Sequence, residues 1–219
     1  MAAGKEIRTK IKSIQNTQKI TKAMEMVAAS KMRKAQDRMS AARPYAERIK
    51  MVVSHIAASH PEYKHPYLHD RQVKRIGLIV VSSDRGLCGG LNINVFKKAL
   101  AQIADWEAKG YQVDVVTFGA KALSMFSRVK STTLIAEKSH LGDTPEVMEV
   151  IGPVQAMLQD YAANNVDEIH IVSNVFENTM TQTPTFHQLV PIVANDSKAL
   201  EHHWDYIYEP DSKEVLDSV

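Results

Sequence analysis

Cysteine, aromatic residues and long apolar runs are scarce in this sequence of 219 residues. The single cysteine, Cys88, excludes an internal disulfide and is typical of a reducing compartment, with the cytoplasm as the expected location. No run of apolar residues reaches the length that a membrane-spanning helix needs, and the N-terminus lacks the apolar core of a signal peptide. Apolar residues still make up 44% of the chain and charged residues 24%, which is the composition of an ordinary globular protein.

Glycine is missing from residues 5–57, and Pro44 is the only proline there. The segment is rich in good helix formers and repeats its small and apolar residues in a 3-4 alternation, which predicts a coiled-coil helix over residues 1–58, roughly 80 Å long. The alternating positions are Ile7, Ile11, Ile14, Gln18, Thr21, Glu25, Ala28, Met32, Ala35, Met39, Ala42, Ala46, Ile49, Val53 and Ile56. Such a helix needs a partner helix. Because proline costs about 3 kcal/mol inside a helix, we expect a bend or a local break at residues 43–45.

The charge is unevenly distributed. Residues 1–57 carry 13 Lys and Arg against 4 Asp and Glu, whereas the remainder carries 14 against 21. A basic segment joined to an acidic body indicates an acidic partner: nucleic acid, anionic lipid or an acidic protein surface. Aromatic residues are absent from residues 1–44 and the charges surround the helix, which argues against nucleic acid. A basic coiled-coil protein that binds nucleic acid remains the alternative function.

Histidines and prolines in residues 59–74 mark a linker, and a different periodicity follows it. Short apolar runs of strand length then alternate with helical patterns. The expected strands cover residues 75–82, 112–118, 132–136, 168–173 and 183–190. The expected helices run from a cap at Asn92 to Gly110, over 120–128, and from a start at 143–146 to about 162, with a kink at 152–153. The sequence therefore predicts an α/β fold, with a long coiled-coil helix and a Rossmann-like three-layer α/β domain, residues 75–210, whose sheet is mainly parallel.

Residues 211–219 have the cap and acid spacing of a helix start, after which the sequence stops. We therefore expect that a C-terminal helix is missing and that it is the partner of the first helix.

No motif predicts catalysis or a cofactor with any strength. The turn Gly86–Gly90 follows a strand and opens a helix, but it lacks the spacing of phosphate-binding loops, so a tight structural turn is favoured over a small α/β enzyme. Cys88 in that turn is interpreted as a buried thiol and not a nucleophile. His55, His60, His65 and His69 lack the spacing of metal ligands. We predict no catalytic residue, no metal and no cofactor.

Three segments, in order along the chain, carry a family resemblance. Residues 20–33 (ITKAMEMVAASKMR) resemble the N-terminal helix of the gamma subunit of rotary ATP synthases. Residues 83–92 (SDRGLCGGLN) resemble the signature of its central domain, and residues 204–210 (WDYIYEP) resemble the stretch before its last helix. The details are similar to the gammaproteobacterial branch.

The resemblance implies a non-catalytic rotor shaft that couples proton flow to ATP synthesis. The implied partners are the alpha and beta subunits of the catalytic hexamer, the epsilon subunit and the c-ring, at the cytoplasmic face of the bacterial inner membrane. It implies contacts of one group of residues with an acidic loop of the catalytic subunits: Lys22, Met24, Lys31, Arg33 and Lys34. It implies contacts of a second group with the rotor ring and epsilon: Arg43, Tyr45, Tyr206 and Tyr208.

Overall fold

The computed structural model describes residues 2–59, 66–68 and 71–192 of the chain. The chain divides into two compact units, residues 1–50 and residues 51–219, and each is treated by itself below. Among the described residues, no helix combines the length and the apolar composition that crossing a bilayer requires. The expected segments 193–210 and 211–219, which include Tyr206 and Tyr208, lie outside the described residues, as does most of the expected linker.

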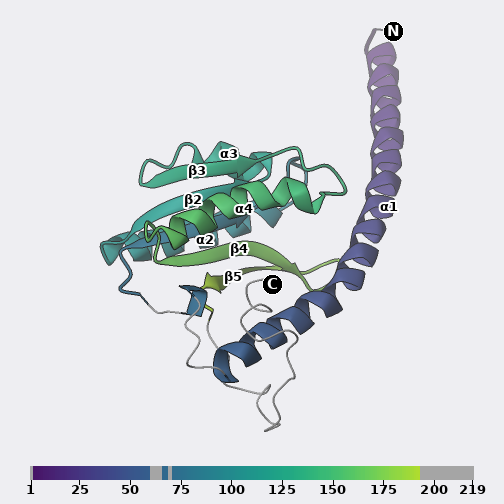
Figure 1. Cartoon of the computed structure of the whole chain (residues 1–219). Coiled ribbons are helices and arrows are strands. Elements are labelled where there is room, and N and C mark those ends of the chain that lie inside the picture. The colour runs from purple at the N-terminus through teal and green to yellow at the C-terminus, as the bar shows by residue number, and fades with distance from the viewer. Residues whose placement is uncertain (1, 60–65, 69–70, 193–219) are drawn as a thin grey trace. The chain divides into compact units, whose positions relative to one another are not determined.

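The first unit consists of one helix, α1, which runs over Ala2–Ser59 and so continues into the second unit (Figure 1). The long N-terminal helix expected from the glycine-free sequence is confirmed. A local break at Pro44 is wrong, because the helix continues through this residue without interruption, whereas the bend expected at residues 43–45 stays a prediction. Pro44 lacks only its own N–H group as a helix donor, and good helix formers lie on both sides of it.

The second unit is an α/β domain built on a five-stranded sheet with the order β3-β2-β1-β4-β5. Its strands are β1 (Arg75–Val81), β2 (Gln112–Phe118), β3 (Thr132–Lys138), β4 (Glu168–Phe176) and β5 (Gln182–Val190). Its helices are α2 (Leu91–Ala108), α3 (Ala120–Phe126), α4 (Val147–Ala162) and the short 3-10 helix η1 (Pro66–Leu68). The first four strands pair in parallel, and β5 joins the edge of β4 in the antiparallel direction. The expected α/β fold with a mainly parallel sheet is confirmed.

Helices cover both faces of this sheet (Figure 1). On one face, Leu78 and Val80 of the central strand belong to a core cluster that also holds Val95 of α2 and Phe126 of α3. On the other face, Ile79 belongs to a second cluster with Met157 and Tyr161 of α4. Because alternate residues of a strand point to opposite faces, a strand that is buried on both sides must be apolar throughout. This is why Arg75–Val81 has the continuous apolar sequence IGLIVV after its first residue.

Several element boundaries differ from those expected. The helix α2 begins at Leu91 with Gly90 as its N-cap, so Asn92 lies inside the first turn and does not cap the helix. The helix α4 begins at Val147, after the expected start at residues 143–146, and the Glu149 carboxylate accepts the backbone N–H of its N-cap, Glu146, at 3.1 Å. Pro153 lies within α4 without breaking it. The strands β3 and β4 extend beyond the expected ends, to Lys138 and Phe176.

The carboxyl edge of the sheet contains a close backbone approach at Gly119, the residue that follows β2. Gly119 has a φ of 92°, and a Cβ placed on it would lie against the backbone carbonyl of Ser82 and 2.7 Å from its Oγ. Ser82 cannot move away easily, because its Oγ donates to the Phe118 carbonyl at 3.1 Å and accepts the Ala122 N–H at 2.8 Å. Only glycine fits both the backbone conformation and the space at this position.

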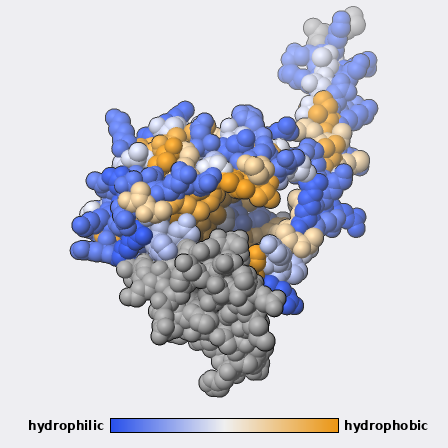
Figure 2. All heavy atoms as spheres, viewed as in Figure 1, coloured by the Kyte–Doolittle hydropathy of each residue, from blue (hydrophilic) through white to orange (hydrophobic). Residues whose placement is uncertain are grey.

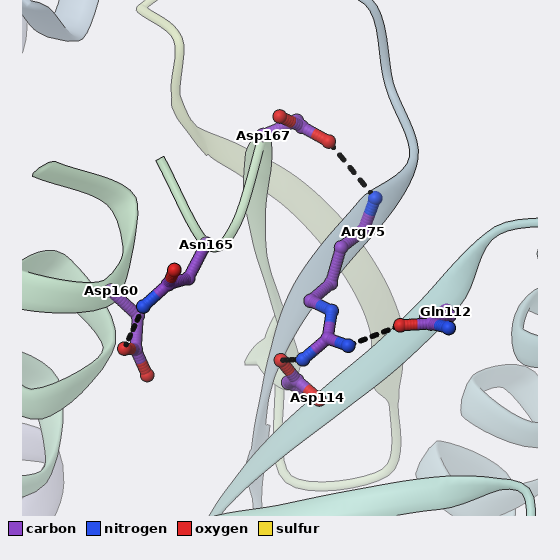
Figure 3. Close-up of polar contacts among 6 residues, drawn as sticks. All are labelled: Arg75, Gln112, Asp114, Asp160, Asn165 and Asp167. Carbon is purple, nitrogen blue, oxygen red and sulfur yellow. Dashed lines mark hydrogen bonds and ion pairs between the residues drawn. The ribbon is translucent and has the colours of Figure 1, made fainter. Parts of the chain in front are cut away.

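The amino edge of the sheet is held by a polar cluster centred on Arg75 (Figure 3). The Nη1 of Arg75 lies 3.2 Å from the Asp114 carboxylate on β2, and its Nη2 donates to the side-chain oxygen of Gln112. Asp114 has a side chain that is only 5% exposed, whereas that of Arg75 is 41% exposed. The Asp167 carboxylate accepts the backbone N–H groups of Lys74 and Arg75 at 2.7 and 3.0 Å. These contacts tie the starts of β1, β2 and β4 together. They also supply the cation that pairs with Asp114, the one carboxylate that is buried among the described residues.

We predict that Gly119→Ala destabilises the domain by about 3 kcal/mol or more, because the new Cβ meets backbone atoms in addition to the strain of a positive φ. Gly142→Ala is the matched control. Gly142 also has a positive φ, 70°, but the space around it is open. This control should lose only about 1 kcal/mol. Urea unfolding of both variants measures the difference, and equal losses would contradict the close approach.

The two partners of the Arg75 pair should contribute unequally to stability. Arg75→Met leaves the Asp114 carboxylate buried without its cation, and we expect a loss of about 3 kcal/mol. Asp114→Asn keeps a hydrogen-bond acceptor for a guanidinium that reaches water, and we expect a loss of about 1 kcal/mol or less. Urea unfolding at neutral pH compares the two variants. If Asp114→Asn cost as much as Arg75→Met, the buried carboxylate would not be what the arginine stabilises.

Candidate functional site

The side chains of α1 leave a stripe of large apolar residues exposed to solvent. Ile7, Ile11 and Ile14 are 57%, 50% and 69% exposed, and they follow one another at spacings of four and three residues. Further along the helix, Ile20, Met24, Met26, Val27 and Met32 are exposed as well. Figure 2 shows apolar residues along α1 between hydrophilic ones. A single helix cannot bury such a stripe on itself, so this surface is built for another polypeptide.

Two threonines on or beside the stripe are satisfied within the helix, whereas the polar side chains of Gln18 and Glu25 are exposed. The hydroxyl of Thr17 donates to the Ser13 carbonyl at 3.1 Å, and the hydroxyl of Thr21 donates to the Thr17 carbonyl at 2.9 Å. A threonine bonded in this way presents its methyl group without needing a polar partner. The stripe can therefore accept an apolar neighbour even at these positions, where the sequence shows polar residues.

The residues expected to meet the catalytic loop are all exposed: Lys22, Met24, Lys31, Arg33 and Lys34. They lie within a short stretch of α1 but on different faces of it. Met24 and Lys31 are seven residues apart and share one face of the helix. Lys22 and Arg33 are eleven residues apart and share another face. This second face lies nearly opposite to Met24. The stretch thus presents cations in several directions around the helix axis.

The residues expected at the rotor ring and epsilon are described only in part. Arg43 lies 3.6 Å from the Glu47 carboxylate one turn along α1, and Tyr45 is 71% exposed. An exposed tyrosine of this kind, with an apolar ring and a polar tip, is typical of protein interfaces. Tyr206 and Tyr208 lie outside the described residues.

The turn Gly86–Gly90 has a structural role in the described domain. The Asn92 side chain sits beneath it: Oδ1 accepts the Ser83 N–H at 3.1 Å, and Nδ2 donates to the Ser83 Oγ at 2.8 Å. Cys88 is half-buried, which corrects the fully buried thiol expected from the sequence. Its thiol contacts Asn92, Ser83 and the Arg85 carbonyl, and none of these groups is a general base.

The described residues offer little evidence for a metal-binding site. Within the ranges 2–59, 66–68 and 71–192, no three His, Cys, Asp or Glu side chains gather as metal ligands would. His60, His65 and His69 are outside these ranges. Asp84, which lies between strand β1 and the glycine turn, was not predicted as a functional residue. An acid three residues after a buried parallel strand is the signal that could have singled it out.

Comparison with known proteins agrees with this arrangement. A family model described as ATP synthase matches residues 3–219. A central-stalk chain in the mitochondrial ATP synthase of Tetrahymena thermophila, solved with its c-ring, is similar in structure with a TM-score of 0.60. The two chains are 20% identical, and the match covers 91% of this chain and 84% of that one.

Two structures of the mitochondrial ATP synthase of Euglena gracilis also match, but too weakly to support an argument. One is the rotor in rotational state 1, and the other is the OSCP/F1/c-ring assembly in rotational state 3. Both have a TM-score of 0.41 and 16% identity over 72% of this chain, covering 62% and 56% of the respective chains.

Nothing in these comparisons supports the nucleic-acid alternative. The family model covers almost the whole sequence, and the fold is that of a central-stalk subunit. This chain belongs to the gamma-subunit family of ATP synthase, whose members are non-catalytic subunits of that complex.

Proposed function

We propose that α1 is the part of the rotor shaft that turns within the ring of alpha and beta subunits, and that the chain also contacts the epsilon subunit and the c-ring. In this proposal it is a peripheral subunit at the cytoplasmic face of the bacterial inner membrane. The observation that carries the proposal is the exposed apolar stripe of α1 together with cations that point in several directions.

Cations on different faces suit a shaft that meets three catalytic subunits in turn. A partner shifts a conformational equilibrium only through contacts that differ between the states. Because Lys22 and Met24 point to nearly opposite sides, each catalytic subunit meets a different surface at any moment. Exposed ion pairs contribute only about 0–1 kcal/mol each, so they can form and break as the shaft turns. Lys31, Arg33 and Lys34 extend the same cationic surface toward the acidic loop.

Arg43 and Tyr45 are proposed as contacts to the rotor ring and the epsilon subunit, together with Tyr206 and Tyr208. Tyr45 supports this assignment through its exposure, and Arg43 is held along the helix surface by Glu47. In the proposal, the tyrosine rings supply apolar area while the guanidinium sets the orientation of the contact.

Association with the proposed partners is tested by purifying the complex. Expressed with the alpha, beta and epsilon subunits, the chain should co-purify with them in an assembly that hydrolyses ATP. Substitution of Ile7, Ile11 and Ile14 by aspartate should reduce this association, because it places carboxylates on the apolar stripe. Full recovery of the assembly with all three substitutions would contradict the role of the stripe.

A substitution in the proposed contact region should weaken coupling. Met24→Lys adds a cation where a 56% exposed apolar side chain faces the acidic loop, and a stronger ion pair should resist rotation. In reconstituted membranes, we expect ATP-driven proton pumping per ATP hydrolysed to fall by about twofold or more.

Thr9→Lys is the matched control for this prediction. Thr9 is exposed, lies outside the proposed contact stretch of residues 22–34, and is on the side of α1 away from Ile7 and Ile11. The substitution adds the same charge to the shaft, but we expect a smaller effect on the ratio of pumping to hydrolysis. Equal effects of the two variants would indicate a general influence of charge, and unchanged pumping with Met24→Lys would contradict the contact.

A further inference from the structure

The carboxylate of Asp84 joins three loops at the carboxyl edge of the sheet. Its Oδ1 accepts the backbone N–H groups of Ala120 and His140, both at 2.9 Å, and its Oδ2 accepts that of Leu141 at 3.1 Å. Asp84 follows β1, Ala120 opens the helix that follows β2, and His140 and Leu141 follow β3. One side chain therefore connects the ends of three neighbouring strands.

The electrostatics of this contact favour the charged carboxylate. Burial alone would raise the pKa of Asp84, but the N–H groups of His140, Ala120 and Leu141, with the charge of His140, hold that pKa below its usual value. His140 also has a φ of 61°, a left-handed conformation that costs a residue with a Cβ about 1 kcal/mol or more. The bond from Asp84 to its N–H helps to hold that conformation. At neutral pH the contact is thus fully formed.

The turn that Asp84 introduces is exposed and ordered by its own contacts. Leu87 is 98% exposed and has a φ of 63°. Beneath it, the Ser83 Oγ donates to the Arg85 carbonyl at 2.6 Å, and Asn92 donates to the Cys88 thiol at 3.2 Å. An exposed apolar side chain on a left-handed residue does not stabilise the domain itself. A turn held in one conformation, however, loses little conformational entropy when it makes a contact.

We propose that Asp84 is a positioning residue of the stalk: its carboxylate fixes the turn of residues 85–90 to the loops that follow β2 and β3. The turn then keeps one conformation while the subunit transmits force between the rotor and the catalytic subunits. The connection is short, because Asp84 follows the end of β1 by three residues and its partners are backbone groups. This inference rests on the central-stalk role and does not depend on the contacts proposed for α1.

Hydrogen exchange in the 219-residue chain tests the connection directly. In Asp84→Asn, the amides of Ala120, His140 and Leu141 should exchange at least about tenfold faster, the factor that corresponds to 1.4 kcal/mol. The amides within β1 and β2 should keep their exchange rates. Asp105→Asn, which removes an exposed carboxylate on α2, is the matched control and should change neither set. A uniform increase in exchange rate over the whole sheet would show that Asp84 only stabilises the domain, and would overturn the proposal. Unchanged exchange rates at the three amides would overturn it as well.

The wild-type chain offers the same test without a substitution, in case Asp84→Asn does not fold. Because the pKa of Asp84 is lowered in the folded state, its contribution is complete above the ordinary value of 3.8 and is lost as the pH falls through the folded pKa. The three amides should therefore lose protection, relative to intrinsic rates, before the sheet amides as the pH is lowered. If all amides lost protection together, the local connection would be refuted.

The functional part of the proposal is tested in the assembled ATP synthase. We expect Asp84→Asn to retain ATP hydrolysis but to reduce proton pumping per ATP at least about twofold, with Asp105→Asn unchanged. Labelling of Cys88 by a thiol reagent should become faster in Asp84→Asn, since this single thiol lies in the turn. A turn that labels faster while the ratio of pumping to hydrolysis stays at the wild-type value would show that its position does not matter for coupling.

Discussion

A single helix cannot bury its own apolar stripe. This constraint governs the first unit of the protein, which consists of one stretch of the 58-residue helix α1. Isoleucine and methionine side chains recur along α1 at spacings that place them on connected faces, and they remain exposed. A free helix would gain nothing from them, since burial of apolar surface is the main favourable term in helix association. Another polypeptide is therefore needed to bury the stripe, and this chain belongs to a family of subunits of a larger complex, ATP synthase.

The second unit, in contrast, contains a buried hydrophobic core of its own on each face of its sheet. Strand β1 lies in the centre of the sheet, with β2 and β4 on its sides and helices on both faces. Its two ends are fastened differently. Arg75 and Asp167 hold the amino end through ion-pair and backbone contacts, and Ser82 and Asp84 hold the carboxyl end through backbone N–H groups. A domain secured at both ends of its central strand is suited to a subunit that transmits force.

The charged side chains of the two units make different kinds of contact. The cations of residues 4–48 lie on the surface of the helix, where solvent weakens each ion pair and leaves it reversible. In the second unit, the buried Asp114 is paired with Arg75, and the Asp84 carboxylate is bound by three N–H groups, so these contacts are lasting ones. Reversible contacts suit the rotating surface that we propose for α1, and buried or multiply hydrogen-bonded contacts suit a domain that keeps one conformation.

Much of this architecture was determined by the sequence alone. The lack of glycine in residues 5–57 and the 3-4 repeat specified the long helix, and the apolar runs specified the parallel strands, because both patterns are local. Contacts between distant residues were decided only by the tertiary structure. Asn92 looked like a helix cap but bonds to Ser83 beneath the turn, and Pro44 remained inside an unbroken helix. The partners of Asp84 were not visible in the sequence, since positions 120, 140 and 141 reach it only when parallel strands bring their carboxyl ends to one edge.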